Sequence, residues 1–318
     1  MKDELTIKLD KYIEESAFYY DLPGLAIGAG SRARDYKYKG AAGYRNIDTK
    51  ETLKPDDIFH MASVTKLFTG MAIMMLIEEK KLKFEDKMVE ILPNAPIDDK
   101  RYEKVTIEHI LTHTSGIVDS QFLWAPEDRY FSYQDMTYDA LGLVVKEASG
   151  MYYDEYVKEK ILLPLGMTSS EISVTQRAGL VSAHAKNEEK EIIAIPYFNY
   201  RRERAPSSTL TSNLEDMKKW AEEFLYKKTL LKPEIYDFIL REHVPIPAIK
   251  QHMCISWFKR EQAGYSLYGH IGSDVGYRSG FWICPELGLH LTVLANITNT
   301  PIIKICEKVF EMLIHATA

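Results

Sequence analysis

The chain has 318 residues, of which 46% are hydrophobic and 27% are charged, as in an ordinary globular protein. Its formal net charge of -6 argues against a nucleic-acid-binding surface, because phosphate contacts need clustered Lys and Arg. No run approaches the roughly 18 apolar residues of a membrane span, and the charged N-terminus has no apolar signal-peptide core. We therefore expect a cytoplasmic protein with neither nucleic-acid nor membrane partners.

The first elements are one helix and two strands. Residues 4–17 are predicted to form an amphipathic helix, because Leu5, Leu9 and Ile13 recur at helical spacing among charges. Two stretches rich in glycine and β-forming residues follow, "PGLAIGAGS" and "DYKYKGAAGYRN". They predict two short strands joined by a turn.

A serine then stands three residues before a lysine, at the start of the apolar stretch "FHMASVTKLFTGMAIMMLIEEKKL". On a helix Ser63 and Lys66 share a face, and a desolvated lysine can accept the proton of a serine hydroxyl. The alternative is that Ser63 only caps the helix, beside a solvated lysine. A second S-x-x-K, Ser256 to Lys259, lies in a strand-like run, where residues three apart point to opposite faces.

Helical patterns dominate the middle of the chain. The stretch "VTIEHILTHTSGI" predicts a helix with Thr106 as its N-cap, and "TYDALGLVVKEASG" predicts a helix closed by Gly150. "SNLEDMKKWAEEFLY" predicts an amphipathic helix, capped by Ser212 or Asn213, with Trp220 and Phe224 facing inward.

The last third changes to strand patterns, "HMCISWFKRE", "YSLYGHIG", "GYRSGFWICPE" and "LHLTVLANIT", and a final helix starts at Pro301. This order predicts an α/β (α+β) fold: an antiparallel sheet flanked by helices, built from both ends of the chain, plus a mostly helical lobe from the middle. We expect residues 1–75 with 206–318 to form the α/β lobe and residues 76–205 the helical lobe. The active site is expected in the cleft between them.

Neither the cysteines nor a pair of histidines predicts a metal site. Cys254, Cys284 and Cys306 are odd in number and lack C-x-x-C spacing, so we interpret them as small buried side chains. His109 and His113 have the spacing of metal ligands on a helix, but the H-E-x-x-H order is absent. No metal or organic cofactor is implied.

Five segments carry a set of motifs in a fixed order, namely "FHMASVTKLFTGMAIMMLIEEKKL", "VTIEHILTHTSGI", "YQDMTYDALGLVVKEASG", "APSSTLTSNLEDMKKW" and "GHIGSDVGYRSGFWICPELGLHLTVLAN". They resemble the S-x-x-K helix, the L-L-T-H-T-S-G-I signature, the Y-x-N element, the D-x-x-x-W helix and the H/K-x-G strand of the serine β-lactamase-related proteins. This family includes class C β-lactamases, DD-peptidases, D-aminopeptidases and esterases. The resemblance covers nearly the whole chain and implies the β-lactamase/transpeptidase-like fold.

The resemblance also implies roles for individual residues. Ser63 would be the acylated nucleophile, and Lys66 would take its proton or stabilise the base that does. Tyr133 would be the partner base, working as a phenolate or as a proton relay, provided that nearby cations lower its pKa from about 10. The backbone N–H groups of Ser63 and of Ser273, which follows the motif ending at Gly272, would form the oxyanion hole.

Two positions depart from the family pattern. Asp135 stands where the family usually has Asn; an ionised aspartate only accepts hydrogen bonds, and it is expected to pair with Lys66 and raise its pKa. His270 stands where true lactamases have Lys, so we expect activity on anionic substrates to fall between about pH 6 and 8. The tripeptide Tyr197-Phe198-Asn199 keeps the Asn but lacks the following helix, and is the weaker alternative for the middle motif.

We therefore expect a serine hydrolase that acts on small esters or amides, with poor turnover of β-lactams and peptides. The alternative within the enzyme class is a D-amino-acid peptidase or weak β-lactamase. The alternative from another class is a non-catalytic ligand-binding or sensor relative that is acylated without turnover. The expected partner is a small-molecule ester, amide or β-lactam-like substrate.

Overall fold

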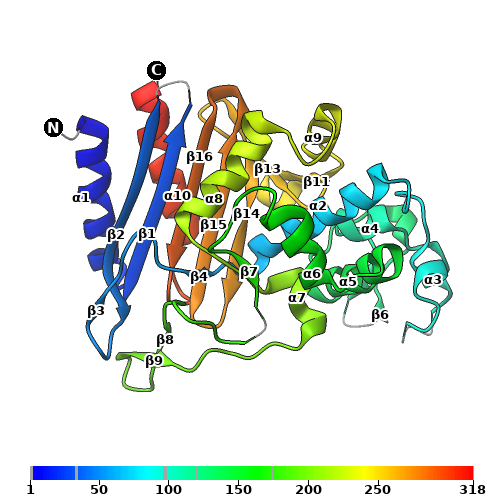
Figure 1. The fold of residues 1–318 in the computed structure, drawn as a ribbon, viewed down its shortest axis with the longest axis horizontal. Helices are drawn as coiled ribbons and strands as arrows, with labels where there is room; N and C mark the ends of the chain where they lie inside the picture. Colours follow the sequence, from blue (N-terminus) through cyan, green and yellow to red (C-terminus); the bar gives the residue numbers. More distant parts are fainter. Residues whose placement is uncertain (1–2, 33–34, 96–98, 119–120, 174, 318) are drawn as a thin grey trace.

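A large antiparallel sheet organises the molecule (Figure 1). The computed structural model describes residues 3–32, 35–95, 99–118, 121–173 and 175–317. Within these ranges nine strands pair in the order β11-β12-β13-β14-β15-β16-β1-β2-β3. Their bounds are β1 (Gly24–Ser31), β2 (Tyr36–Asn46), β3 (Glu51–Thr52), β11 (Val244–Ile246), β12 (Gln251–Met253), β13 (Phe258–Gln262), β14 (Tyr265–Asp274), β15 (Tyr277–Cys284) and β16 (Leu289–Ala295). Because β1 pairs with both β16 and β2, the two ends of the chain build one sheet, which confirms the prediction.

Helices cover both faces of this sheet (Figure 1). The helices α1 (Glu4–Tyr19) and α10 (Ile302–Thr317) pack on one face, and α8 (Leu214–Glu222) packs on the other. Strand β1 contributes side chains to the hydrophobic cores on both faces of the sheet, because successive side chains of a strand point in opposite directions. Leu25 and Ile27 join the core beneath α1 and α10, whereas Ala26 joins the core on the opposite side.

The remaining helices gather beside the β11–β14 end of the sheet, where α2 lies among its neighbours (Figure 1). They are α2 (Thr65–Glu78), α3 (Met88–Ile91), α4 (Ile107–Leu111), α5 (Asp135–Ser149), α6 (Tyr153–Val157), α7 (Ala205–Ser208) and α9 (Pro233–Ile239). Short strands complete the fold: β4 (Phe59–His60), β5 (Ile117–Val118), β6 (Gln121–Phe122), β7 (Glu171–Ile172), β8 (Ala183–Lys186), β9 (Ile192–Ile195) and β10 (Leu210–Ser212). The division into lobes at 75/76 and 205/206 stays a prediction, and both boundaries fall inside helices, α2 and α7.

The predicted helix ends are largely confirmed. The Thr106 side chain caps α4 by accepting the N–H of His109, and Gly150 closes α5 with a positive φ of 76°. Of the two cap candidates for α8, the structure uses Asn213, whose side chain accepts the N–H of Asp216 at 3.0 Å.

One local prediction is wrong. The stretch "HMCISWFKRE" is not one strand: β12 and β13 are separated by a turn in which Ser256 has a φ of 66°, a left-handed conformation that a continuous strand does not allow. Helix α6 continues directly as a π-helical turn over Lys158–Leu162.

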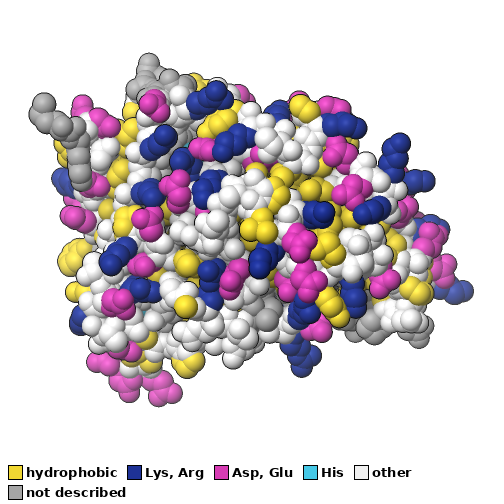
Figure 2. Space-filling view, viewed as in Figure 1, with side chains coloured by type: hydrophobic (Ala, Val, Ile, Leu, Met, Phe, Trp, Pro, Cys, Tyr) yellow, Lys and Arg dark blue, Asp and Glu magenta, His cyan; other side chains and the backbone are white. Residues whose placement is uncertain are grey.

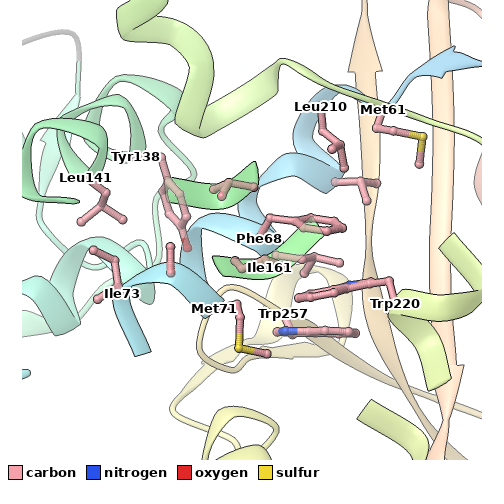
Figure 3. Close-up of a cluster of buried hydrophobic side chains, with 14 of the residues drawn as sticks. Met61, Phe68, Met71, Ile73, Tyr138, Leu141, Ile161, Leu210, Trp220 and Trp257 are labelled. Atoms are coloured by element: carbon pink, nitrogen blue, oxygen red, sulfur yellow. The ribbon is translucent and has the colours of Figure 1, made fainter. Parts of the chain in front are cut away.

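Helix α2 is buried on almost every side. Its sequence is apolar all round, which is typical of a helix inside a core rather than on a surface. Phe68, Met71 and Ile73 of this helix pack with Trp220 and Trp257 in one hydrophobic cluster (Figure 3). Within the described ranges, no helix combines the length and apolar character needed to cross a membrane.

The charges on one face of the surface and the state of the cysteines can be described directly. Acidic and basic side chains are interspersed on the face in Figure 2, without a large area of one sign. The thiols of Cys254, Cys284 and Cys306 are free and buried, as predicted.

Candidate active site

Ser63 lies in a short 3₁₀ turn, η1 (Ala62–Val64), between β4 and α2. The Lys66 Nζ, one turn further on, donates a hydrogen bond to the Ser63 Oγ at 3.2 Å. The N-cap positions of η1 and α2 are Met61 and Val64, and neither start is capped by a side chain, so the capping interpretation of Ser63 is wrong. Ala62, just before the serine, has a φ of 46°. Such left-handed conformations of non-glycine residues are costly and cluster at functional sites.

Lys66 is fully buried and all three of its protons have acceptors. Its Nζ donates to Ser63 Oγ at 3.2 Å, to Asp135 Oδ1 at 2.6 Å and to the carbonyl oxygen of Ser207 at 2.8 Å. Burial lowers the pKa of Lys66, but the oxygens of Tyr133 and Asp135 outweigh it and raise the pKa above its usual value. The resting site therefore holds an ammonium group, and the expected pairing of Asp135 with Lys66 is present.

Asp135 opens helix α5, where the helix dipole favours a negative charge. Its second oxygen, Oδ2, lies 3.7 Å from an Arg204 guanidinium nitrogen, and another nitrogen of Arg204 lies 3.3 Å from Asp139. Burial raises the pKa of Asp139 to about 6. Sequence reasoning missed Arg204, Asp139 and the Ser207 carbonyl. Of these three groups, only Asp139 could have been found from the sequence. It lies four residues after Asp135 on a predicted helix, and residues four apart on a helix share a face.

Tyr133 is partly buried between His113 and His270, and its hydroxyl oxygen is buried. The centroid of its ring lies 4.4 Å from the ring centroid of His113 and 5.9 Å from that of His270. The Lys66 Nζ lies 4.9 Å from the Tyr133 ring centroid. The His113 Nδ1 accepts the N–H of Gln134, which fixes the backbone between the tyrosine and α5. Burial raises the pKa of Tyr133 more than the charge of Lys66 lowers it. The expectation that cations depress this pKa is therefore wrong, and the phenol is neutral.

His270 is buried on β14 against the ring of Phe258, at 5.0 Å between centroids. Its Nδ1 lies 2.6 Å from the Ile271 carbonyl oxygen, so this nitrogen carries the proton and donates it. Burial and the charge of Lys66 lower the pKa of His270 to about 3. The expected titration between about pH 6 and 8 is therefore wrong, because the imidazole is uncharged throughout that range.

Gly272 lets strand β14 lie against the turn that carries Ser63. Pairing with β13 ends at Gly269, whereas pairing with β15 continues to Asp274, so beyond Gly269 one edge of β14 has no strand partner among the described residues. A Cβ on Gly272 would come within 2.3 Å of the Met61 carbonyl oxygen, so only glycine permits this approach. Ser273 follows on the same strand and is exposed.

The competing motifs do not form sites. Ser256 Oγ accepts a hydrogen bond from the Tyr138 hydroxyl at 3.0 Å, whereas Lys259 pairs with Glu242 at 2.6 Å. The Tyr197 hydroxyl lies 3.1 Å from the Nδ1 of His60, and not beside Ser63.

The histidine pair does not form a metal site either. His109 serves the cap of α4, and His113 supports Gln134. No group of three or more His, Cys, Asp or Glu side chains in the described part of the chain is arranged to hold a metal ion.

Comparisons of the sequence and the fold with known proteins find similar chains. A family model described as Beta-lactamase matches residues 9–302. Protein flp of Staphylococcus aureus (strain N315) is 24% identical over 340 residues, which cover 97% of this chain and 66% of that protein, so the chain spans just under two thirds of its length.

Solved structures give the same fold. The octameric penicillin-binding protein homologue from Pyrococcus abyssi superposes with a TM-score of 0.85 at 24% identity, covering 97% of this chain and 77% of that one. The D-amino acid amidase from Ochrobactrum anthropi SV3, complexed with L-phenylalanine amide, gives 0.86 at 14% identity, covering 99% and 100%. At these identities the likeness shows the fold alone, which confirms the β-lactamase/transpeptidase-like prediction.

Proposed function

The chain belongs to the Beta-lactamase family, and from that membership we propose that it is a serine hydrolase acting on small esters or amides through an acyl-enzyme on Ser63. The observation that carries the proposal is the hydrogen bond of 3.2 Å between the buried Lys66 Nζ and the Ser63 Oγ. A nucleophile beside a base that a third group holds in place is the usual arrangement of covalent catalysis. Here Asp135 and the Ser207 carbonyl hold the amine.

The proposed reaction begins with attack of Ser63 Oγ on the acyl carbon. Its proton passes to the Lys66 amine, which must first lose one of its own protons to solvent, because Asp135, at 2.6 Å, holds it in the ammonium form. The neutral Tyr133 hydroxyl serves as a proton relay to the leaving group. Water then cleaves the acyl-enzyme and restores the serine.

We place the oxyanion hole between the backbone N–H groups of Ser63 and Ser273. The support is the free edge of β14 beyond Gly269 and the close approach of Gly272 to the Ser63 turn. One such donor is typically worth about 3 kcal/mol of activation free energy. Asp135 and His270 would contact the substrate as acceptors, through a carboxylate oxygen and through the Nε2 of the neutral imidazole.

The proposed site draws on both predicted lobes. Ser63, His270 and Ser273 belong to the lobe of residues 1–75 with 206–318, and Tyr133 and Asp135 belong to residues 76–205. The contacts of Lys66 with Ser63 and with Asp135 support an active site between the two.

The raised pKa of Lys66 supports esters as the preferred substrates. An alkoxide or phenoxide leaves with less protonation than an amine, so an ester depends less on proton transfer through the lysine. The likeness to a D-amino acid amidase keeps a D-amino-acid peptidase or weak β-lactamase as the alternative. The Asp135–Lys66 pair also favours a second class, a sensor that is acylated and does not turn over.

The test is hydrolysis of p-nitrophenyl acetate by the native protein and by Ser63→Ala, with the first turnover followed for a burst. Ser266→Ala is a matched control, because the Ser266 hydroxyl donates to the exposed Glu261 carboxylate at 2.8 Å and lies at the other end of β14 from Ser273. Turnover that Ser63→Ala abolishes and Ser266→Ala keeps supports the hydrolase. A Ser63-dependent burst without turnover supports the sensor, and equal activity in Ser63→Ala overturns both.

A further inference from the structure

A largely buried polar cluster adjoins the proposed site in sequence, and its side chains take no chemical part in the proposed reaction. It comprises His60, Tyr197, Tyr200, Ser208 and Asp274. We propose that the Asp274 carboxylate is a positioning group. It keeps three parts of the site in fixed positions relative to one another: the turn that carries Ser63, the Ser207 carbonyl that binds Lys66, and the β14 segment that carries the Ser273 N–H. This inference rests on the proposed function.

The Asp274 carboxylate joins three segments that are far apart in the sequence. Its Oδ2 accepts the Ser208 Oγ–H at 2.7 Å and lies 3.3 Å from the His60 Nε2. Its Oδ1 accepts the N–H of Val275 at 2.8 Å, which fixes the rotamer of the side chain.

Each segment leads within three residues to a part of the proposed machinery. His60 ends β4, three residues before Ser63. Ser208 follows Ser207, whose carbonyl oxygen accepts a proton of Lys66 at 2.8 Å. Asp274 follows Ser273, whose N–H is the second proposed oxyanion donor. A shift of the carboxylate would therefore move nucleophile, base and oxyanion donor relative to one another.

The His60 side chain is held in place by two tyrosines. The His60 side chain is buried, its Nδ1 lies 3.1 Å from the Tyr197 hydroxyl, and its ring stacks on Tyr200 with centroids 5.3 Å apart and an interplanar angle of 9°. Burial would raise the pKa of Asp274, but the hydrogen bond and charge of His60 and the hydroxyl of Ser208 outweigh it and hold the pKa below its usual range. The group therefore stays ionised at neutral pH.

The cluster is not a second catalytic triad. In a triad the histidine stands between the serine and the carboxylate, whereas here Ser208 and His60 both bind the same oxygen of Asp274. The remaining alternative is a polar cluster that stabilises the fold without affecting the chemistry. That alternative predicts lost stability in Asp274 variants, with unchanged kcat in the fraction that is folded.

The experiment compares Asp274→Ala and Asp274→Asn with the native chain, after Ser63-dependent turnover of p-nitrophenyl acetate has been established. Displaced oxyanion donors weaken only the transition state. We expect Asp274→Ala to lower kcat by about tenfold to a hundredfold, with KM changed less than about threefold. Binding of a methylphosphonate transition-state analogue should weaken by the same factor as kcat/KM. Asp274→Asn, which keeps an acceptor oxygen, should recover part of the loss.

Asp237→Ala is the matched control, since this carboxylate is largely exposed and pairs only with Lys228. Active-site titration with the phosphonate counts the competent molecules, so a loss of folded protein is separated from a loss of kcat. If Asp274→Ala does not fold, the decision rests on the nearly isosteric Asp274→Asn, for which we expect a kcat at least about threefold below native. Native kcat in the folded variants, or a change confined to KM, would overturn the inference and leave the proposed function standing. Turnover that survives Ser63→Ala would overturn both.

Discussion

The Lys66 Nζ and the Asp135 Oδ1 form an ion pair of 2.6 Å, in which the lysine is fully buried and the aspartate is partly exposed. The serine that Lys66 is proposed to activate lies 3.2 Å from the same nitrogen. The Asp135 carboxylate therefore helps the amine to hold its proton, because a negative partner raises a lysine pKa.

Asp135→Asn is expected to speed acylation at neutral pH. Lys66 must be neutral to accept the Ser63 proton, and its raised pKa keeps it charged below the alkaline range. Loss of the carboxylate lowers that pKa, so the acidic limb of the rate profile moves to lower pH and the rate at pH 7 rises. Burst rates with p-nitrophenyl acetate and with nitrocefin, from pH 6 to 10, measure the shift.

Asp154→Asn, which disrupts a surface pair with Arg202, is the control for the loss of one carboxylate. Unchanged acylation by nitrocefin would contradict the idea that Asp135 disfavours β-lactams. A slower rate in Asp135→Asn would instead make Asp135 the acceptor of the lysine proton.

The preference for anionic substrates is expected to be flat across neutral pH. The pKa of His270, lowered to about 3, means that the ring is protonated only in strong acid and adds no positive charge between pH 6 and 8. The ratio of kcat/KM for the p-nitrophenyl monoester of succinate to that for p-nitrophenyl acetate should vary less than about twofold over this range. A fall of about tenfold that His270→Gln removes would show that the imidazole is charged.

Gly272→Ala is expected to impair activity more than folding. Its Cβ would lie 2.3 Å from the Met61 carbonyl oxygen, so β14 must move away from the turn that carries Ser63. Overpacking of this kind costs about 1–3 kcal/mol, whereas a misplaced oxyanion donor costs about a hundredfold in kcat. The control is Gly28→Ala in the same sheet, whose Cβ would have its nearest neighbours in the Leu214 side chain, at 3.1 Å and beyond. Thermal unfolding and kcat, measured on both variants, separate the two costs; native kcat in Gly272→Ala would contradict the proposed role of β14.

The sequence by itself determined the architecture and supplied the main residues of the candidate site. Hydrophobic periodicity and turn residues are local signals, and they placed α1, α5, α8 and the strands at both ends of the chain. The motif order proposed Ser63, Lys66, Tyr133 and the strand with His270 as one candidate site. Local pattern failed at the turn through Ser256, where the backbone is left-handed.

Only the tertiary structure decided the charge states of that site. Burial and neighbouring charges set a pKa, and both depend on which distant segments meet. The neutral His270, the neutral Tyr133 and the charged Lys66 follow from such contacts, as do Arg204 beside Asp135 and the Asp274–His60–Ser208 cluster. These partners lie 66 or more residues apart in the chain, a separation at which no local spacing rule operates.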